Sequence, residues 1–263
     1  MKKILTGLAM AAAVTAQVLT AQAFAGTLKI AATAVPHAEI LEFLKPSLAK
    51  QGVTLDVKVF TDYVQPNTQV NEGRLDANFF QHQPYLTEFN ASRGTQLVSV
   101  VGVHVEPFGA YSTKHKKLAN LPERAQIALP NDATNGGRAL LLLQTAGLIK
   151  LNPEAGITAT PRDIIENPKK LRFKELEAAT LPRILGQVDL ALINTNYALE
   201  AGLNPAKDAL IIEGRDSPYV NILVVKEGTE QNPDLVKLIA ALKTPAVSNF
   251  INITYKGAIA PIY

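Results

Sequence analysis

The stretch LDANFFQHQPYL, residues 75–86, changes character halfway along its length. Its first part is apolar enough for a buried strand, which we expect over residues 75–79. The following residues are aromatic or hydrogen-bonding, among them Phe80, His82 and Tyr85. A plain surface turn needs neither rings nor a histidine, whereas pockets for small ligands combine apolar walls with a few placed polar groups. The stretch therefore predicts one wall of a small-molecule cleft.

The composition is that of a globular protein, with 47% apolar and 19% charged residues among 263. A chain of this length forms one large domain or two of about 100–150 residues each. Without Lys2 and Lys3, which lie in a segment that we expect to be removed, the formal charge of +3 becomes +1. This balance predicts no nucleic-acid partner. The sequence has no cysteine, which excludes a disulfide framework, a thiol nucleophile and a cysteine-based metal site.

The N-terminus has the pattern of a secretory signal peptide. A basic start at residues 2–3 is followed by an apolar run at residues 4–16, and Ala23 and Ala25 place small residues at the two positions that a signal peptidase reads. A membrane anchor is the alternative, but polar residues interrupt the run before it reaches the about 20 apolar residues that span a bilayer. We therefore expect residues 1–25 to be removed by cleavage after Ala25.

Beyond the signal peptide, apolar runs with a strand pattern alternate with amphipathic helical segments. Strands are expected at residues 28–32, 53–59, 75–79, 126–129, 171–175, 189–193, 210–213 and 220–225. Helices are expected at residues 37–50, 66–72, 139–143, 233–242 and 247–255. This order predicts an α/β fold with parallel sheets.

Two breaks in the pattern predict two lobes. An apolar strand meets a proline and a glycine at residues 105–109, and a return crossing is expected near residues 217–219. The first lobe would comprise residues 27–107 plus 221–263, and the second lobe residues 108–220. Two extended crossover strands between the lobes would act as hinges.

A short internal repeat supports two similar lobes. Residues 73–77 and 186–190 share the pattern Gly-x-apolar-Asp-apolar, and each opens a strand that ends in polar or aromatic groups. Ligands of α/β proteins gather beyond the carboxyl ends of the strands. The repeat therefore favours a cleft between the lobes, although chance is a fair competitor for a five-residue pattern.

His82 is the first candidate binding residue. A lone histidine is more often a structural hydrogen-bonding group than a ligand or catalyst. Here it stands at a strand end between Phe80 and Tyr85, where side chains can converge on one pocket. His82 would donate to a ligand carboxylate, while the two rings enclose an apolar side chain.

Arg138 is the second candidate. It follows a strand and a loop in which Asp132 or Thr134 can cap the next helix. Free N–H groups at a helix start favour an anion, and an arginine in the first turn can bind a carboxylate through two bonds. An exposed arginine, or one paired with a nearby aspartate, is the competing interpretation.

Asparagines at strand ends are the third group. Asn194 and Asn196 follow a buried strand, and Asn221 interrupts the apolar run of residues 219–225. An unsatisfied buried amide costs about 1–3 kcal/mol, so these groups need partners. The partner is either a ligand's ammonium or carboxylate group, or another amide of the core.

The sequence contains none of the short motifs that would indicate an enzyme. The GxSxG, HExxH, GxGxxG and GxxxxGK[ST] patterns do not occur, and the four histidines lack metal-ligand spacing. We therefore expect no enzymatic activity, no metal and no cofactor. An enzyme that uses the cleft, with His82 as base, stays open as the less favoured alternative.

Several runs, taken together, resemble one family. They are residues 76–86, 130–140, 194–198 and 217–221, with FFQHxPYL as the most specific. They are similar to the methionine-binding proteins of ABC importers, the NlpA/MetQ lipoprotein family, in the same order along the whole mature chain. The resemblance implies a type II periplasmic binding protein, in which two α/β lobes joined by two crossovers close on a ligand.

The resemblance also implies roles for individual residues. Arg138 would hold the α-carboxylate of an amino acid, and Asn196 and Asn221 would bind its polar head. The pocket around the thioether would be lined by Tyr63, Phe80, His82 and Tyr85. Sulfur against aromatic rings is a favourable contact of about 0.3–1.5 kcal/mol.

The predicted function is capture of L-methionine by lobe closure and delivery to an ABC transporter permease with a separate ATPase. Family members usually carry a lipid on a cysteine at the cleavage site, whereas Gly26 follows Ala25 here. We therefore expect a periplasmic monomer, soluble after cleavage and without a lipid anchor. The departure leaves open a same-fold receptor for D-methionine, another amino acid or a methionine-containing dipeptide.

Overall fold

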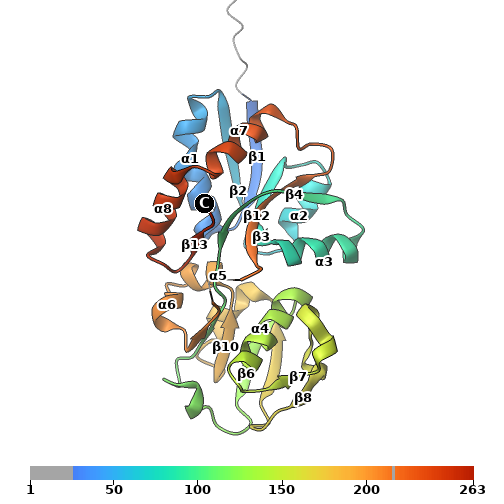
Figure 1. Cartoon of the computed structure of the whole chain (residues 1–263), viewed down its shortest axis with the longest axis vertical. Helices are drawn as coiled ribbons and strands as arrows, with labels where there is room; N and C mark the ends of the chain where they lie inside the picture. The colour runs from blue at the N-terminus through green and yellow to red at the C-terminus, as the bar shows by residue number, and fades with distance from the viewer. Residues whose placement is uncertain (1–25, 215–216) are drawn as a thin grey trace, which may run out of the picture.

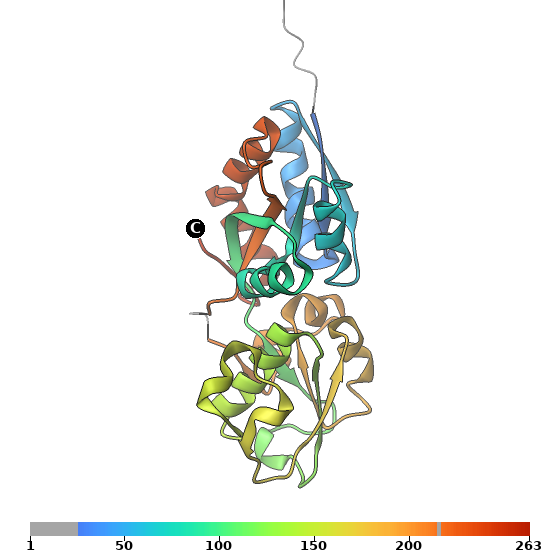
Figure 2. The ribbon, with the colours of Figure 1, turned by 90° about the vertical axis from the view of Figure 1, so that its right-hand side faces the viewer.

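The computed structural model describes residues 26–214 and 217–263, which form two α/β lobes along the long axis of the molecule (Figure 1). The predicted signal peptide, residues 1–25, lies outside the described residues. Within the described ranges, no helix is long and apolar enough to cross a membrane. Both ends of the described chain belong to one lobe, and the middle of the chain forms the other (Figure 2).

The first lobe is built on a six-stranded sheet. Its strands, in spatial order, are β2 (Val53–Val59), β1 (Gly26–Ala32), β3 (Ala77–His82), β12 (Val220–Lys226), β4 (Leu97–Val105) and β13 (Ala260–Pro261). The helices of this lobe are α1 (Glu39–Ala49), α2 (Gln65–Asn71), α3 (Gln83–Arg93), α7 (Pro233–Leu242) and α8 (Pro245–Tyr255), with a short turn of helix, η1 (Ala34–Ala38), before α1.

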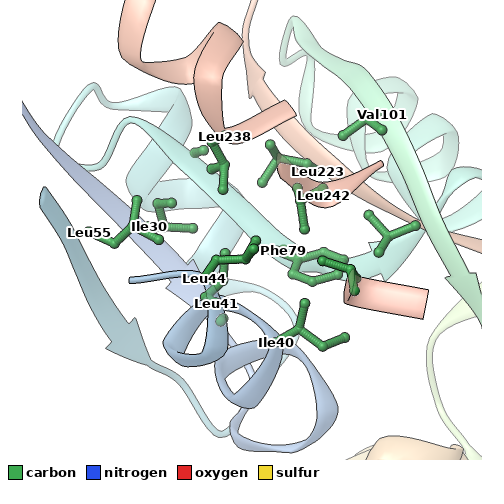
Figure 3. Packing of buried hydrophobic residues seen from close by; sticks show 14 of the residues in the cluster. Ile30, Ile40, Leu41, Leu44, Leu55, Phe79, Val101, Leu223, Leu238 and Leu242 are labelled. Carbon is green, nitrogen blue, oxygen red and sulfur yellow. The ribbon is translucent and has the colours of Figure 1, made fainter. Parts of the chain in front are cut away.

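Successive strand residues point to opposite faces of a sheet, so both faces of this sheet carry apolar side chains, and helices cover both. Ile30 packs in a cluster with α1, α7 and α8, whereas its neighbour Ala31 packs in a cluster with α2 and α3. Figure 3 shows the first cluster, which contains Leu41 and Leu44 of α1 and Phe79 of β3. Phe79 is fully buried, so replacing it with alanine would cost about 3–5 kcal/mol.

The second lobe is built on a five-stranded sheet and a small hairpin. The strands of the sheet, in spatial order, are β9 (Arg172–Leu176), β6 (Gln126–Pro130), β10 (Leu190–Ile193), β5 (Gly109–Tyr111) and β11 (Ile211–Ile212). The hairpin pairs β7 (Lys150–Leu151) with β8 (Ile164–Glu166). The helices are α4 (Ala133–Thr145), α5 (Thr195–Glu200) and α6 (Pro205–Asp208), with short 3₁₀ segments η2 (Leu118–Asn120), η3 (Pro153–Thr158), η4 (Pro161–Asp163) and η5 (Ala178–Ile184).

Both sheets are mixed, whereas the sequence predicted parallel sheets. Five strands have the same spatial order in both sheets: β2, β1, β3, β12 and β4 correspond to β9, β6, β10, β5 and β11, and β13 is an additional edge strand of the first sheet. The antiparallel strands inside the two sheets, β12 and β5, are those by which the chain enters each lobe from the other, and β13 is antiparallel at the edge of the first sheet. Strands β12 and β5 start at the interlobe face, where the parallel strands end, and therefore run the opposite way.

The repeat found in the sequence occupies equivalent places in the two lobes. Asp76 precedes β3 and accepts a hydrogen bond from the N–H of Lys29 in β1 (2.7 Å). Asp189 precedes β10 and accepts one from the N–H of Gln126 in β6 (2.8 Å). In both lobes the aspartate therefore joins the third strand to the first.

Two predicted boundaries differ from the structure in ways that affect the site. The strand expected at residues 75–79 is β3, which continues to His82, so the polar end of the stretch is itself strand. The helix expected from residue 139 is α4, which begins at Ala133. The predicted lobe boundaries stay a prediction, and the first sheet takes its strands from residues 26–105 and 220–261.

Candidate functional site

A pocket with an empty volume of about 330 Å³ lies between the two lobes. The structure brings together all seven residues predicted from the sequence: Tyr63, Phe80, His82, Tyr85, Arg138, Asn196 and Asn221. Asn194, which the sequence analysis had weighed with Asn196 and Asn221, also lines the pocket, and four residues that were not predicted complete the lining: Gln81, Glu106, Asn135 and Thr195.

The shared topology explains why these residues meet. The carboxyl ends of parallel strands and the amino ends of β5 and β12 face the cleft between the lobes. His82 ends β3, Glu106 follows β4, and Asn194 follows β10. Asn221 is the second residue of β12, where it lies opposite His82. Side chains far apart in the sequence therefore converge at one edge of each sheet.

Aromatic rings form the wall on the side of the first lobe. The ring centroid of Tyr63 lies 5.8 Å from that of Phe80 and 5.9 Å from that of Tyr85. The hydroxyl of Tyr85 donates to the carbonyl oxygen of Tyr63 (2.9 Å), which fixes the two rings relative to each other. The wall can enclose an apolar side chain of a ligand.

His82 uses both ring nitrogens within the protein. It is the N-cap of α3, and its Nδ1 accepts from the N–H of Tyr85 (3.1 Å). Nε2 therefore carries the hydrogen and donates to Oδ1 of Asn135 in the other lobe (3.1 Å). Burial lowers the pKa of His82 to about 3, so the ring is neutral. In this arrangement His82 positions the two walls. Both of its ring nitrogens already have partners, so neither is free to make the predicted bond to a ligand carboxylate.

Arg138 is buried and lies in the second turn of α4, whereas the sequence placed it in the first turn. Its Nε and Nη2 donate to the two carboxylate oxygens of Glu213 (2.7 and 2.6 Å), and Nη2 also donates to the carbonyl oxygen of Glu106 (2.8 Å). The guanidinium stacks over the ring of Tyr219 at 4.1 Å. Nη1 takes part in none of these hydrogen bonds among the described residues, so it is the guanidinium nitrogen that can bind a ligand.

The start of α4 is fixed by its cap and by a close packing contact. As predicted, Asp132 is the cap, and its carboxylate accepts from the N–H of Asn135 (2.9 Å). A Cβ on Gly137 would lie 2.1 Å from the carbonyl oxygen of Ile157. The glycine therefore allows η3 to pack on α4 and hold Arg138 in the pocket.

A chain of amides sets the orientation of the polar wall. Asn135 donates through Nδ2 to the carboxylate of Asp132 (3.0 Å), so its Oδ1 points away and accepts from Nδ2 of Asn194 (2.8 Å). Asn196 accepts from the hydroxyl of Tyr63 through Oδ1. Within the described part of the chain, Oδ1 of Asn194 and Nδ2 of Asn196 are buried without a partner. An acceptor and a donor are therefore available to a ligand.

Sequence reasoning missed a carboxylate beside these amides. Glu106 accepts from Nε2 of His104 (2.9 Å) and from the N–H of Asn196 (3.0 Å), and its Oε1 lies 3.4 Å from Nε2 of His37. Nε2 of His37 also lies 3.0 Å from Oδ1 of Asn221. The signal was present, because a histidine and a glutamate alternate at the carboxyl end of the strand that precedes the first crossing.

The same cluster is the one group among the described residues with metal-binding donors close together. His37, His104 and Glu106 are all buried and offer ligand atoms within 4.8 Å of one another. Their hydrogen bonds account for this approach without an ion. The four histidines are separated in the sequence, which is why motif spacing did not indicate the cluster.

Several hydrogen bonds among the described residues hold the lobes together around the pocket, including those of Asn196 and Arg138 to Glu106 and three others. The three others join Tyr63 to Asn196, His82 to Asn135, and the hydroxyl of Tyr197 to the carbonyl oxygen of Thr61 (3.0 Å). A pocket between two α/β lobes, lined by buried polar groups some of which have no partner among the described residues, is typical of a substrate-binding protein.

Comparison with known proteins gives the family. The profile of the NlpA lipoprotein family matches residues 28–263, and the chain belongs to this family. "D-methionine-binding lipoprotein MetQ" of Salmonella typhimurium is 45% identical over 81% of this chain and 79% of that protein. "Outer membrane lipoprotein 3" of Mannheimia haemolytica is 44% identical over 88% of each chain.

A solved structure agrees with the fold. A nutrient-binding protein from Burkholderia cenocepacia bound to methionine superimposes with a TM-score of 0.87 at 45% identity, covering 90% of this chain and all of that one. The resemblance found in the sequence is therefore confirmed, as is the fold of two α/β lobes. The family is that of the methionine-binding substrate-binding proteins of ABC transporters.

The predicted localisation is wrong. We expected a soluble protein without a lipid anchor, but the matching family and both relatives named above are described as lipoproteins. The prediction rested on the absence of one residue type. A missing thiol removes one chemistry of attachment and does not decide where a protein resides.

Proposed function

We propose that this protein captures L-methionine between its lobes and delivers it to the permease of an ABC transporter with a separate ATPase. The observation that carries the proposal is the pocket itself, in which an aromatic wall faces a wall of buried amides and a guanidinium. An amino acid with a long apolar side chain complements both walls. Binding and release complete this function, and no bond is made or broken.

The polar wall supports a zwitterionic head group. Nη1 of Arg138 and Nδ2 of Asn196 are donors that can bind a carboxylate, and hydrogen bonds to charged groups contribute about 1.5–3 kcal/mol each. Asn221 lies on the other side of the pocket and presents an amide from the first lobe. The head group would therefore be held from both lobes.

The aromatic wall supports a thioether. Tyr63, Phe80 and Tyr85 surround the remaining space with rings whose centroids are 5.8–5.9 Å apart. Sulfur is polarisable, and its contact with an aromatic ring is worth about 0.3–1.5 kcal/mol. A side chain without sulfur would lose that contribution.

Closure follows from a ligand that touches both walls. A ligand shifts a conformational equilibrium only through its differential affinity for the two states. Methionine would contact both walls only when the lobes are together, so it would favour the closed state, which the permease would then recognise.

A methionine-containing dipeptide is the second candidate, and one feature favours it. A wider groove adjoins the pocket, shares Tyr63 and Tyr85 with it, and continues between the lobes past Asp132 and Glu177. A second residue could extend into this groove. D-methionine and other amino acids would occupy the same pocket as L-methionine, so only a comparison of their affinities distinguishes these candidates.

The test is thermal unfolding of protein that has been unfolded, stripped of ligand and refolded. The panel contains L-methionine, D-methionine, methionine dipeptides and the other amino acids. A ligand at about a thousand times its dissociation constant adds about 4 kcal/mol, which shifts the midpoint by several degrees. The proposal expects the largest shift with L-methionine, recovered unchanged afterwards. No shift with any methionine compound, or turnover of the ligand, would contradict it.

A further inference from the structure

We infer that Glu106, held by His37 and His104, pairs with the α-ammonium group of the ligand and makes the site selective for ligands with a free amino group. The inference rests on the proposed function and specifies how that site recognises the head group. Among the described residues that line the pocket, Glu106 is the only carboxylate.

The position of the carboxylate is fixed from three sides. One oxygen accepts from His104 and lies near His37, and the other accepts from the backbone N–H of Asn196. The residue is only 6% exposed. It therefore points into the pocket without rotational freedom, as a preorganised acceptor does.

The two histidines support the carboxylate without neutralising it. Burial lowers the pKa of His37 to about 4 and that of His104 to about 3, so both rings are neutral near pH 7. His104 donates its Nε2–H to the carboxylate, whereas Nε2 of His37 bonds to Asn221 and lies 3.4 Å from Glu106, and neither ring brings a positive charge. A buried carboxylate is costly to keep ionised without a cation, and burial accordingly raises the pKa of Glu106.

The nearest cation is already paired. Arg138 makes a two-bond ion pair with Glu213, and its contact with Glu106 is to the backbone carbonyl oxygen, not to the carboxylate. The ligand's ammonium group is therefore the cation that can form an ion pair with the carboxylate of Glu106.

A second acceptor lies in the same lining. Oδ1 of Asn194 is buried without a partner in the described chain, and its orientation is fixed because Nδ2 donates to Asn135. An ammonium has three donors, and the two acceptors can share it. The donors Arg138 and Asn196 remain for the carboxylate.

The test compares two ligands that differ by one group. L-methionine and 4-(methylthio)butanoate share the thioether and the carboxylate, but only methionine has the ammonium. Their dissociation constants are measured by calorimetry on refolded wild type and on Glu106→Gln, which keeps the shape of the side chain. Glu39→Gln is the matched control, because Glu39 bonds to Tyr255 outside the pocket.

We expect Glu106→Gln to weaken L-methionine by about 30-fold or more, the lower end for a buried charge pair. The deaminated analogue should bind both proteins equally, and Glu39→Gln should bind both ligands like the wild type. A second measurement is the melting temperature without ligand. Removing an unpaired buried charge should leave it unchanged or raise it.

Three results would overturn the inference without contradicting the proposed function. An equal loss for both ligands, together with a lower melting temperature, would mean that Glu106 is only structural. Unchanged methionine affinity would remove Glu106 from recognition. Loss of affinity after dialysis against EDTA would mean that a metal ion carries the positive charge. If the wild type binds no methionine at all, the proposed function itself fails.

Discussion

The two lobes share a strand order but present different chemistry to the pocket. The rings of Tyr63, Phe80 and Tyr85 all come from the lobe of the first sheet, and Arg138 and Asn196 come from the lobe of the second. The difference lies in the loops and strand ends, because the sheets have the same order. Duplicated topology thus provides two facing edges, and each edge recognises a different half of the ligand.

The lobes also differ in their buried titratable groups. His37, His82 and His104 belong to the first lobe and are buried, whereas Asp132 belongs to the second and is partly exposed. Burial lowers the pKa of His37 to about 4 and those of His82 and His104 to about 3, from an ordinary value of 6.5. Burial raises the pKa of Asp132.

The largest expected effect is therefore an unequal response to acid. Between pH 6.5 and about 4 the unfolded chain binds protons that the folded histidines do not, so stability falls with falling pH by about 1.4 kcal/mol per pH unit for each histidine. Asp132 and, in the first lobe, Glu106 act in the opposite direction, because burial raises the pKa of both carboxyl groups and their folded forms take up a proton more readily. Amide exchange at pH 7 and pH 5 should show the first lobe opening earlier. Equal acceleration in both lobes would contradict this.

Arg138 is expected to matter for the fold as well as for binding. Arg138→Ala would remove the expected contact with the ligand carboxylate, and it would also break the ion pair of this residue with Glu213. Removing one partner of a buried ion pair costs about 3–5 kcal/mol. We expect that loss in urea unfolding, together with an affinity for L-methionine lower by at least about 30-fold.

A double variant separates the two effects. Arg138→Met with Glu213→Gln removes both charges, so most of the stability should return while the affinity stays low. Recovery of affinity in the double variant would show that Arg138 serves the fold alone.

The smallest expected effect concerns the aromatic wall. Tyr63→Ala should weaken L-methionine by about 1 kcal/mol more than it weakens alanine, because only methionine places a sulfur against the ring. Calorimetric titration of both amino acids measures the difference. An equal loss would mean that the ring does not distinguish side chains, and that Tyr63 acts through its bond to Asn196.

Much of the fold could be predicted from periodicity, and the exceptions have physical causes. The strands at residues 53–59 and 220–225 were placed within one residue of β2 and β12, because alternation and apolar runs are local signals. The antiparallel direction of β12 depends on where the chain re-enters the lobe, which no local pattern contains. The early start of α4 was missed because residues 133–137 are polar or glycine, although Asp132 caps it.

The site shows the same division. Strand ends identified His82 and Asn196, because topology makes such positions converge. The pairing of Arg138 with Glu213 joins residues 75 positions apart, and in the cluster around Glu106 the bond of His37 to Asn221 joins residues 184 positions apart. Such contacts depend on tertiary structure, so the sequence could suggest the residues and not their partners.

The most direct test is a crystal structure of the refolded protein with L-methionine. It should place the carboxylate within hydrogen-bonding distance of Arg138 and Asn196, and the sulfur among the rings of Tyr63, Phe80 and Tyr85. A methionine bound in the reverse orientation, or outside the interlobe pocket, would contradict the division of recognition between the two lobes.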